Sequence, residues 1–323
     1  MTRSQLSHRD AAAAPKLITR KVMIPVVAPF RLDFTVWALK RRLENHIDQW
    51  QDGTYLRVLV IDDLPVGVII RQQGTIIHPK LDVTFISCKP LGEVQEQQVL
   101  HALQRMLGAQ VDLRPFYSLI AKSKMLQGLA KEFRGVKPPR FPDLFEALVN
   151  AISCQQLSLT VGMTLMTRFA EKFGKGFADG HAMRHAFPRP EDLTHSEEAD
   201  IRMLGYSANK AKAILEIAKV LHEQPMAFAR LETMDNEEVV DFLMSLRGIG
   251  RWSAQYVLLR GLGRLNIFPG DDVGAQNNLQ KLFHLKTKPG YDTIDRLTSR
   301  WQPYRGMIYF HLLLQKLRQA GVL

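Results

Sequence analysis

Residues that hold metals and clusters are scarce in this chain. Two of its 323 residues are cysteines, Cys88 and Cys154. A disulfide framework, a four-cysteine zinc site and an iron–sulfur cluster all need more thiols, so none of these is expected. The 10 histidines form no cluster with acidic residues along the sequence, which disfavours a zinc-dependent nuclease. The sequence therefore predicts no metal site built from side chains and a protein that suits a reducing compartment.

Long apolar runs are also missing. No stretch approaches the roughly 20 apolar residues that a membrane-spanning helix needs. Residues 1–20 carry basic side chains but lack the apolar core of a secretory signal, so they are expected to form a disordered tail. We therefore expect an intracellular protein, in the cytoplasm and nucleoid or in a eukaryotic nucleus, without a membrane partner.

Acidic residues are outnumbered by basic ones. The chain has 43 lysines and arginines against 32 aspartates and glutamates, which gives a formal net charge of +11. No acidic residue follows Asp295. A basic excess favours a polyanionic partner such as DNA or RNA. Charge alone leaves open a basic soluble protein without such a partner.

The length of the chain predicts roughly two or three structural units. Residues 21–112 read as a small α+β domain, because apolar residues 81, 83 and 85 alternate with polar ones as on a strand. A hairpin is expected around Asp62-Asp63-Leu64-Pro65, a first strand at 22–27 and another at 75–77. Residues 113–323 are expected to be helical, and helices begin after the capping residues Asp143, Ser158, Ser207 and Asp235.

The most informative stretch is a glycine hairpin followed by two aspartates. A short helix meets Gly248-Ile249-Gly250 and a second helix leaves at once, so a helix-hairpin-helix unit is expected near 236–263. Gly248 and Gly250 permit backbone conformations that other residues resist. Free amides at the start of the second helix suit a phosphate, and Arg247 and Arg251 would add salt-sensitive contacts.

Two aromatic residues follow the hairpin at helical spacing. Trp252 and Tyr256 lie one turn apart, so their rings can line one wall. An electron-rich wall attracts a cationic base through a cation–π contact of about 0.5–2 kcal/mol. The alternative is that both rings are ordinary core, but we expect at least one to line a pocket.

A set of motifs between residues 141 and 314 occurs in a characteristic order. Together they resemble the helix-hairpin-helix (HhH-GPD) DNA glycosylases, and within these the AlkA-like branch of DNA-3-methyladenine glycosylase II. The segments that carry the resemblance are Phe145-Glu146-Ala147-Leu148-Val149, Gln155-Gln156-Leu157-Ser158, Leu204-Gly205, Lys210-Ala211, the run 246–256, Phe268-Pro269 with Asp271-Asp272, and Trp301-Gln302-Pro303-Tyr304-Arg305.

The resemblance implies a multidomain, mainly α fold. Residues 21–112 would be the TATA-binding-protein-like domain of the AlkA branch, and residues 113–323 an all-α glycosylase region with helices on either side of a cleft. The implied activity is base excision repair, in which an alkylated purine such as 3-methyladenine or 7-methylguanine is flipped out of double-stranded DNA and released. A monomer is expected.

Asp272 matches the position of the family's catalytic carboxylate. Cleavage of an N-glycosidic bond builds positive charge on the sugar, which a fixed carboxylate stabilises while it orients or deprotonates a water. The alternative is that Asp272 only caps the helix that follows. Asp271 is the better candidate for a purely structural role.

Trp252 stands where bifunctional members of the family carry a lysine. That lysine forms a Schiff base with the sugar, which a tryptophan cannot do, so the resemblance implies hydrolysis without strand cleavage. Counted from Trp301, a pocket tryptophan of the final helix falls at Leu313, and Val273 replaces an aromatic residue after the catalytic aspartate. These departures predict a less aromatic pocket and a different substrate range.

Other site positions follow from the same resemblance. The wedge that fills the vacated base stack maps to Gln156, between Gln155 and Leu157, although buried polar residues at a helix end are the alternative, most of all for Gln155. Arg305 matches a position near the active site and equally suits a structural ion pair. A monovalent cation at the hairpin carbonyls is implied, and no other cofactor.

Two alternatives to alkylpurine excision remain open. One is a catalytically idle helix-hairpin-helix protein that recognises lesions or structured DNA. An aspartate at the family's distance from the hairpin argues against it, because binding needs no carboxylate. The other is a glycosylase for oxidised or deaminated bases. Trp252 argues only against a version of such an enzyme that also has lyase activity.

Overall fold

The N-terminal part of the protein is an antiparallel sheet with helices. The computed structural model of the protein describes residues 17–180 and 182–323. Five strands lie side by side in the order β1-β5-β4-β3-β2. Their bounds are β1 (Ile18–Pro25), β2 (Gln49–Gln51), β3 (Thr54–Ile61), β4 (Leu64–Thr75) and β5 (His78–Ser87).

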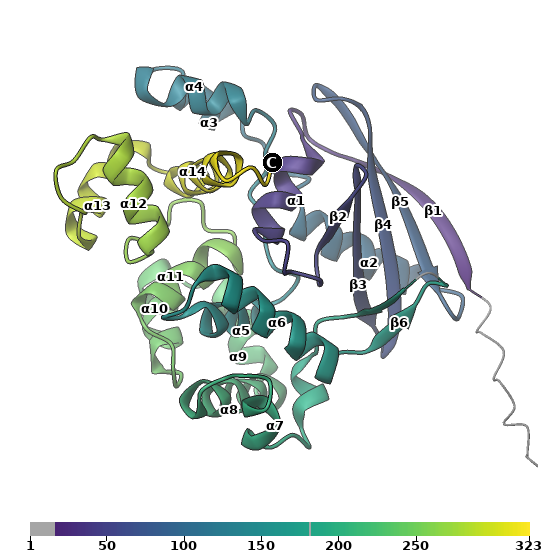
Figure 1. The fold of residues 1–323 in the computed structure, drawn as a ribbon. Coiled ribbons are helices and arrows are strands. Elements are labelled where there is room, and N and C mark those ends of the chain that lie inside the picture. The colour runs from purple at the N-terminus through teal and green to yellow at the C-terminus, as the bar shows by residue number, and fades with distance from the viewer. Residues whose placement is uncertain (1–16, 181) are drawn as a thin grey trace, which may run out of the picture.

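The alternating pattern of β5 has the expected effect on burial. At most 1% of the surface of Leu81, Val83 or Phe85 is exposed. They belong to the apolar face of the sheet, which is covered by α1 (Leu32–Lys40) and α2 (Glu93–Met106). Figure 1 shows α2 running across the sheet and α1 between the sheet and the rest of the molecule. The N-terminal part is thus an α+β layer built on one sheet face.

Several boundaries of this part differ from the prediction. The first strand starts at Ile18, inside the segment expected to be a disordered tail, because its backbone pairs with β5 up to Ser87. Residues 1–16 of that segment lie outside the described residues. The β3–β4 hairpin is confirmed, and Asp62 and Asp63 form its turn with φ of 45° and 65°. A separate strand at 75–77 was wrong, since Thr75 ends β4 and pairs with His78.

The remainder of the chain is mainly helical, as predicted. Its helices are α3 (Arg114–Ile120), α4 (Lys124–Glu132), α5 (Leu144–Cys154), α6 (Leu159–Phe173), α7 (Glu198–Arg202), α8 (Ala208–Glu223), α9 (Pro225–Ala229), α10 (Asn236–Ser245), α11 (Arg251–Arg260), α12 (Val273–Leu282), α13 (Tyr291–Thr298) and α14 (Arg305–Gln319). Short 3-10 turns, η1 (Pro190–Leu193), η2 (Arg230–Glu232) and η3 (Ser299–Trp301), connect some of them.

Side-chain caps fix where four of these helices begin. Asp143, Ser158, Ser207 and Asp235 each accept a hydrogen bond from a backbone N–H of the first turn of α5, α6, α8 and α10. These caps confirm the prediction from sequence. Each satisfies an amide that would otherwise lack a partner, which is worth about 1 kcal/mol per helix.

A small hairpin from the helical part covers the other sheet face. The strands β6 (Gly176–Ala178) and β7 (Met183–His185) pair with each other, and Phe177 packs with Val58 of β3. The space above Gly67 is filled by the Phe177 ring, 2.5 Å from where a Cβ would stand. No strand was predicted here.

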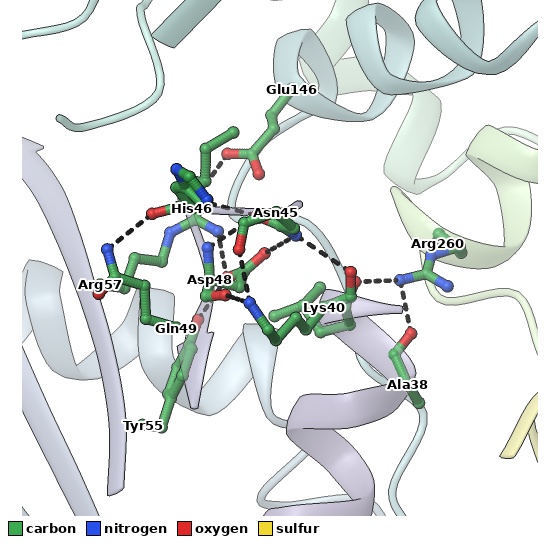
Figure 2. Close-up of polar contacts among 12 residues, drawn as sticks. Ala38, Lys40, Asn45, His46, Asp48, Gln49, Tyr55, Arg57, Glu146 and Arg260 are labelled. Atoms are coloured by element: carbon green, nitrogen blue, oxygen red, sulfur yellow. Dashed lines mark hydrogen bonds and ion pairs between the residues drawn. The ribbon is translucent and has the colours of Figure 1, made fainter. Parts of the chain in front are cut away.

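A buried polar network also ties the two parts together. Arg57 of β3 contacts Asp48, 2.6 Å away, and Glu146 of α5, and all three side chains are nearly inaccessible. Arg260 of α11 donates to the Ala38 carbonyl of α1 at 2.9 Å. Figure 2 shows these side chains converging around the segment after α1. Because the apolar core is also continuous across both parts, the end of α1 is held firmly against α5 and α11.

Candidate active site

A cleft of about 970 Å³ opens between the two halves of the helical part. Its walls come from the turn between α5 and α6, the N-terminus of α11, the start of α12 and one face of α14. The hairpin helices, the two aspartates and the α5–α6 turn are far apart in sequence, yet all of them reach this cleft. A cleft of this size suits a base-sized ligand.

Asp272 uses its two carboxylate oxygens differently. Oδ1 accepts the backbone N–H of Ala275 at 2.8 Å and so caps α12. Oδ2 lies 3.3 Å from the Trp252 Nε1 and 3.3 Å from the Tyr309 hydroxyl, both of which donate to it. The side chain lines the cleft. The capping role and a chemical role are therefore compatible, because each needs a different oxygen.

Asp271 lines the same cleft, but its carboxylate is bound by Arg251. Its carboxylate accepts from Arg251 Nε at 2.7 Å and from Arg251 Nη2 at 3.0 Å. The same guanidinium lies 3.9 Å from the centre of the Tyr291 ring. Asp271 thus fixes the start of α11 against α13, as the structural role predicts. Arg251 is occupied by this pair and stays about half exposed.

Trp252 and Tyr256 stack, but only Trp252 reaches the cleft. Their ring centroids lie 5.4 Å apart with planes 29° apart. Tyr256 is 1% exposed and donates its hydroxyl to Asn150 Oδ1 at 2.8 Å. Its ring already faces the guanidinium of Arg41 at 5.6 Å and that of Arg260 at 5.5 Å. Tyr256 supports Trp252 from behind and is not available to a cationic base.

The final helix contributes a second aromatic residue that sequence reasoning missed. Tyr309 lines the cleft together with Leu313, one turn further along α14. The signal was available, because a residue four positions before Leu313 shares its helix face. Val273 is exposed and lines the cleft mouth. Burial raises the pKa of Tyr309 well above its usual range, and Asp272 adds to the effect, so its hydroxyl keeps the proton it donates.

The hairpin has the expected backbone. Gly248 has a φ of 78°, and a Cβ there would lie 2.8 Å from Ala213 Cβ, so both conformation and space require glycine. Gly250 is the N-cap of α11 and has open space around it. Ile249 is buried and anchors the loop between α10 and α11. Arg247 is exposed and 3.1 Å from Glu216.

The turn between α5 and α6 stands next to the hairpin. Gln155 donates to the Gly248 carbonyl at 2.7 Å and to Ser253 Oγ at 2.8 Å, so it locks the turn to the hairpin. Gln156 is exposed and has a left-handed φ of 55°. Leu157 is 44% exposed beside it. The structure therefore gives Gln155 a structural role and leaves Gln156 and Leu157 at the tip.

Two basic residues have structural partners that the sequence did not reveal. Lys210, which belongs to one of the segments that carry the resemblance, donates to the Gln155 carbonyl at 2.7 Å. Arg305 donates to the Asn266 carbonyl at 2.6 Å and pairs with Asp295 at 2.5 Å. Arg305 does not line the cleft, so the structural ion pair is the alternative that holds.

The N-terminal part also reaches the cleft, which was not predicted. Arg41 and Arg42, directly after α1, line its floor beside Cys154. No sequence signal marks them, because the tertiary packing of α1 places them there. Lys316 of α14 lines the rim.

The described residues contain neither a metal-binding cluster nor a helix that could span a membrane. Within residues 17–180 and 182–323, no three histidine, cysteine, aspartate or glutamate side chains gather in a way that would hold a metal ion. In the same part of the chain, no helix combines the length and apolar character needed to cross a bilayer.

Comparison with known proteins finds a family that resembles the part of the chain around the cleft. The sequence model of the HhH-GPD superfamily base excision DNA repair proteins matches residues 149–303. The matched segment, just under half of the chain, is similar to the members of that superfamily. The match includes the α5–α6 turn, the hairpin and Asp272, and stops before Tyr309 and Leu313.

The chain is also similar to curated relatives and, in its fold, to a solved structure. The chain is 26% identical over 295 residues to a DNA-3-methyladenine glycosylase of Bacillus subtilis, with 90% of this chain and 95% of the relative covered. It is 28% identical over 180 residues to DNA-3-methyladenine glycosylase 2 of Escherichia coli, with 55% and 60% covered. The structure of a 3-methyladenine DNA-glycosylase from Archaeoglobus fulgidus superposes with a TM-score of 0.78 at 23% identity, covering 91% of this chain and 97% of that one.

Proposed function

We propose that the protein is a DNA glycosylase that releases alkylated purines by hydrolysis of the N-glycosidic bond, in base excision repair. One observation carries the proposal: a carboxylate oxygen of Asp272 lines the cleft, held by Trp252 and Tyr309, while the other oxygen caps α12. A protein that only bound DNA would need the hairpin but not this oxygen.

The chemistry follows from where the carboxylate lies. As the bond from C1′ to the base breaks, positive charge develops on the sugar, and Asp272 Oδ2 stabilises it electrostatically. The same oxygen orients a water and takes its proton as the water adds to C1′. An N-alkylated purine is already cationic and leaves as a neutral base, so little acid assistance is needed.

The flipped base enters between the aromatic and apolar side chains of the cleft. Trp252 supplies a face for stacking, with Leu313 and Tyr309 on the opposite helix. Gln156 and Leu157, at the tip of the α5–α6 turn, enter the vacated stack of the duplex. The cleft has fewer aromatic side chains than the AlkA-like branch implied, which favours shape and charge over stacking as the basis of selection.

DNA docks on the hairpin, and the protein acts as a monomer on double-stranded DNA. The amides that begin α11 after Gly250 face a phosphate beside the lesion. Arg247 and Arg251 exchange exposed ion pairs, worth about 0–1 kcal/mol, for phosphate contacts. A monovalent cation between the hairpin carbonyls and the phosphate fits the same arrangement. The N-terminal part is the TATA-binding-protein-like domain of this branch.

The proposed reaction leaves an abasic site without strand cleavage. Trp252 occupies the position of the Schiff-base lysine, so no amine follows the hairpin there. Lys316 at the cleft rim is an amine that borohydride trapping can test directly. We expect no covalent adduct with damaged DNA; an adduct at Lys316 or any other residue would contradict hydrolysis by water.

The experiment that tests the function is chromatography of the bases freed from methylated DNA. We expect 3-methyladenine and 7-methylguanine in the soluble fraction, and abasic sites in the DNA. Tight binding to the same DNA with no freed base would favour the catalytically idle alternative instead.

A further inference from the structure

The cleft carries more positive than negative side chains. The charged residues that line it are four cations and two carboxylates, Arg41, Arg42, Arg251, Lys316, Asp271 and Asp272. The alkylated base proposed as substrate is itself cationic, and like charges repel each other. The excess positive charge therefore does not serve the base. It suits the other part of a flipped nucleotide, the anionic sugar–phosphate backbone.

Three of the four cations are already engaged within the protein. Arg251 forms its ion pair at 2.7 Å. Arg41 Nη2 donates to Asn150 Oδ1 at 2.8 Å, and Arg42 Nη1 donates to the Arg41 carbonyl at 3.1 Å. Lys316 differs, because its exposed ammonium group forms no hydrogen bond or ion pair with any residue of 17–180 or 182–323. Lys316 is thus the cleft cation that is ready to receive an anion.

Lys316 lies at the outer end of the α14 face that lines the cleft. Tyr309, Leu313 and Lys316 follow one another at helical spacing on this face. Tyr309 is 7% exposed, Leu313 is half-buried and Lys316 is exposed. Tyr309 contacts Asp272 at the deep end, where the proposed function places the base and C1′. The ammonium group therefore stands at the mouth, where the backbone of a flipped nucleotide remains.

Gly274 of α12 leaves open the space between Lys316 and the proposed catalytic carboxylate. A Cβ at Gly274 would lie 3.1 Å from Asp272 Oδ1 and 3.7 Å from Lys316 Nζ. The two charged groups thus border the same small space. When C1′ lies at Asp272, a phosphate attached to the same sugar comes within reach of the long, flexible side chain of Lys316. Lysine binds phosphate as a point charge, which demands little of the angle of approach.

We propose that Lys316 is a positioning residue that binds a backbone phosphate of the flipped nucleotide and so holds C1′ against Asp272. This rests on the proposed glycosylase function. Lys316 belongs to the cleft and not to the hairpin on which undamaged DNA docks, so the contact forms only when a nucleotide has left the duplex. Binding energy that appears only in that state offsets part of the cost of unstacking. Lys316 acts here as a protonated amine, in keeping with a reaction that forms no Schiff base.

The salt dependence of binding to two duplexes tests this role. One duplex carries a tetrahydrofuran abasic-site analogue, whose sugar can enter the cleft, and the other is undamaged. Fluorescence anisotropy gives the slope of log affinity against log salt, to which each phosphate contact contributes about 0.9. Lys316→Gln is expected to reduce the slope by about that amount on abasic-site DNA alone, and to lower affinity for it about 3–10-fold. Lys316→Arg keeps a cation and is expected to keep the wild-type slope.

Lys80→Gln is the matched control, because it removes the same formal charge from an exposed position on β5 that does not line the cleft. It is expected to leave both slopes unchanged. An unchanged slope for Lys316→Gln on abasic-site DNA, or an equal reduction on both duplexes, would overturn the role of Lys316. Failure of the wild-type protein to free any base from methylated DNA would instead refute the proposed function, and it is measured without reference to the salt slopes.

Discussion

Glu146→Gln is expected to leave the stability of the protein nearly unchanged at pH 5 and to raise it relative to the wild type at higher pH, although it alters a buried ion cluster. Glu146 is 1% exposed and contacts Arg57, whose other partner is Asp48 at 2.6 Å. Asp48 also accepts the Tyr55 hydroxyl at 2.7 Å. Burial alone raises the pKa of Asp48, but Arg57, Tyr55 and Asn45 outweigh it, so the net pKa is lowered.

Of the two carboxylates that contact the Arg57 guanidinium, Glu146 is the one that ionises less readily. Burial raises its pKa from the ordinary 4.5 to about 8, with Asp48 and Asp143 adding to the rise and Arg57 offsetting part of it. At neutral pH one carboxylate of the cluster is therefore ionised, opposite one guanidinium, and Glu146 keeps its proton. A glutamine reproduces that neutral form, so the change in unfolding free energy should stay below about 1 kcal/mol near pH 5, close to the ordinary pKa of 4.5. Breaking an ionised buried pair would cost about 3–5 kcal/mol.

The pH dependence gives the sign of the effect. Between pH 4.5 and about 8 the folded protein binds a proton at Glu146 that the unfolded chain has lost. The unfolding free energy of the wild type therefore falls as pH rises through this window, by up to about 1.4 kcal/mol per pH unit from this group. Glu146→Gln lacks this contribution, so it should gain stability relative to the wild type as pH rises, on the order of 4 kcal/mol across the window.

Urea unfolding followed by tryptophan fluorescence at pH 5, 6.5 and 8 measures this difference. Asp48→Asn is the matched control, because it removes the ionised partner, and it should destabilise the protein more than Glu146→Gln at pH 6.5. If Glu146→Gln lowers the unfolding free energy by several kcal/mol at pH 6.5 and keeps the pH dependence of the wild type, then Glu146 does not carry a proton in the folded protein.

Three further predictions concern the cleft and the DNA surface. Tyr309→Phe removes a donor to Asp272 and keeps the ring, so base release should fall about tenfold, measured in single turnover, and an unchanged rate would argue against a role for the hydroxyl. Gln156→Ala should weaken binding to abasic-site DNA about fivefold, by fluorescence anisotropy; unchanged binding would exclude it as the wedge. Arg247→Ala should reduce the slope of log affinity against log salt by about 1 if the side chain contacts a phosphate. An unchanged slope would mean that Arg247 stays paired with Glu216 when DNA is bound.

Much of the site could be predicted because its signals are local. Gly248 has a backbone that glycine alone adopts easily, and the capping aspartates and serines act within one helical turn. Asp272 could be placed because it lies at a fixed distance from the hairpin. The alternation of Leu81, Val83 and Phe85 was enough to indicate β5.

The features that could not be predicted from the sequence depend on contacts between segments that are far apart in the chain. Arg41 reaches the cleft because Arg260, 219 positions later, holds the end of α1. Tyr256 looked like a pocket wall, but arginines from two elements already occupy the space around its ring. The β6–β7 hairpin forms because Phe177 fills the space above Gly67 on the sheet. None of these pairings can be predicted from the residues that surround each partner in the sequence.

The central claim is that Asp272 carries the chemistry, and Asp272→Asn tests it most directly. Asparagine caps a helix as well as aspartate does, so α12 should keep its N-cap and the fold should be preserved. Single-turnover release of 3-methyladenine should fall about 10²–10⁴-fold, while affinity for abasic-site DNA stays close to that of the wild type. Retained release in the folded variant would contradict the account.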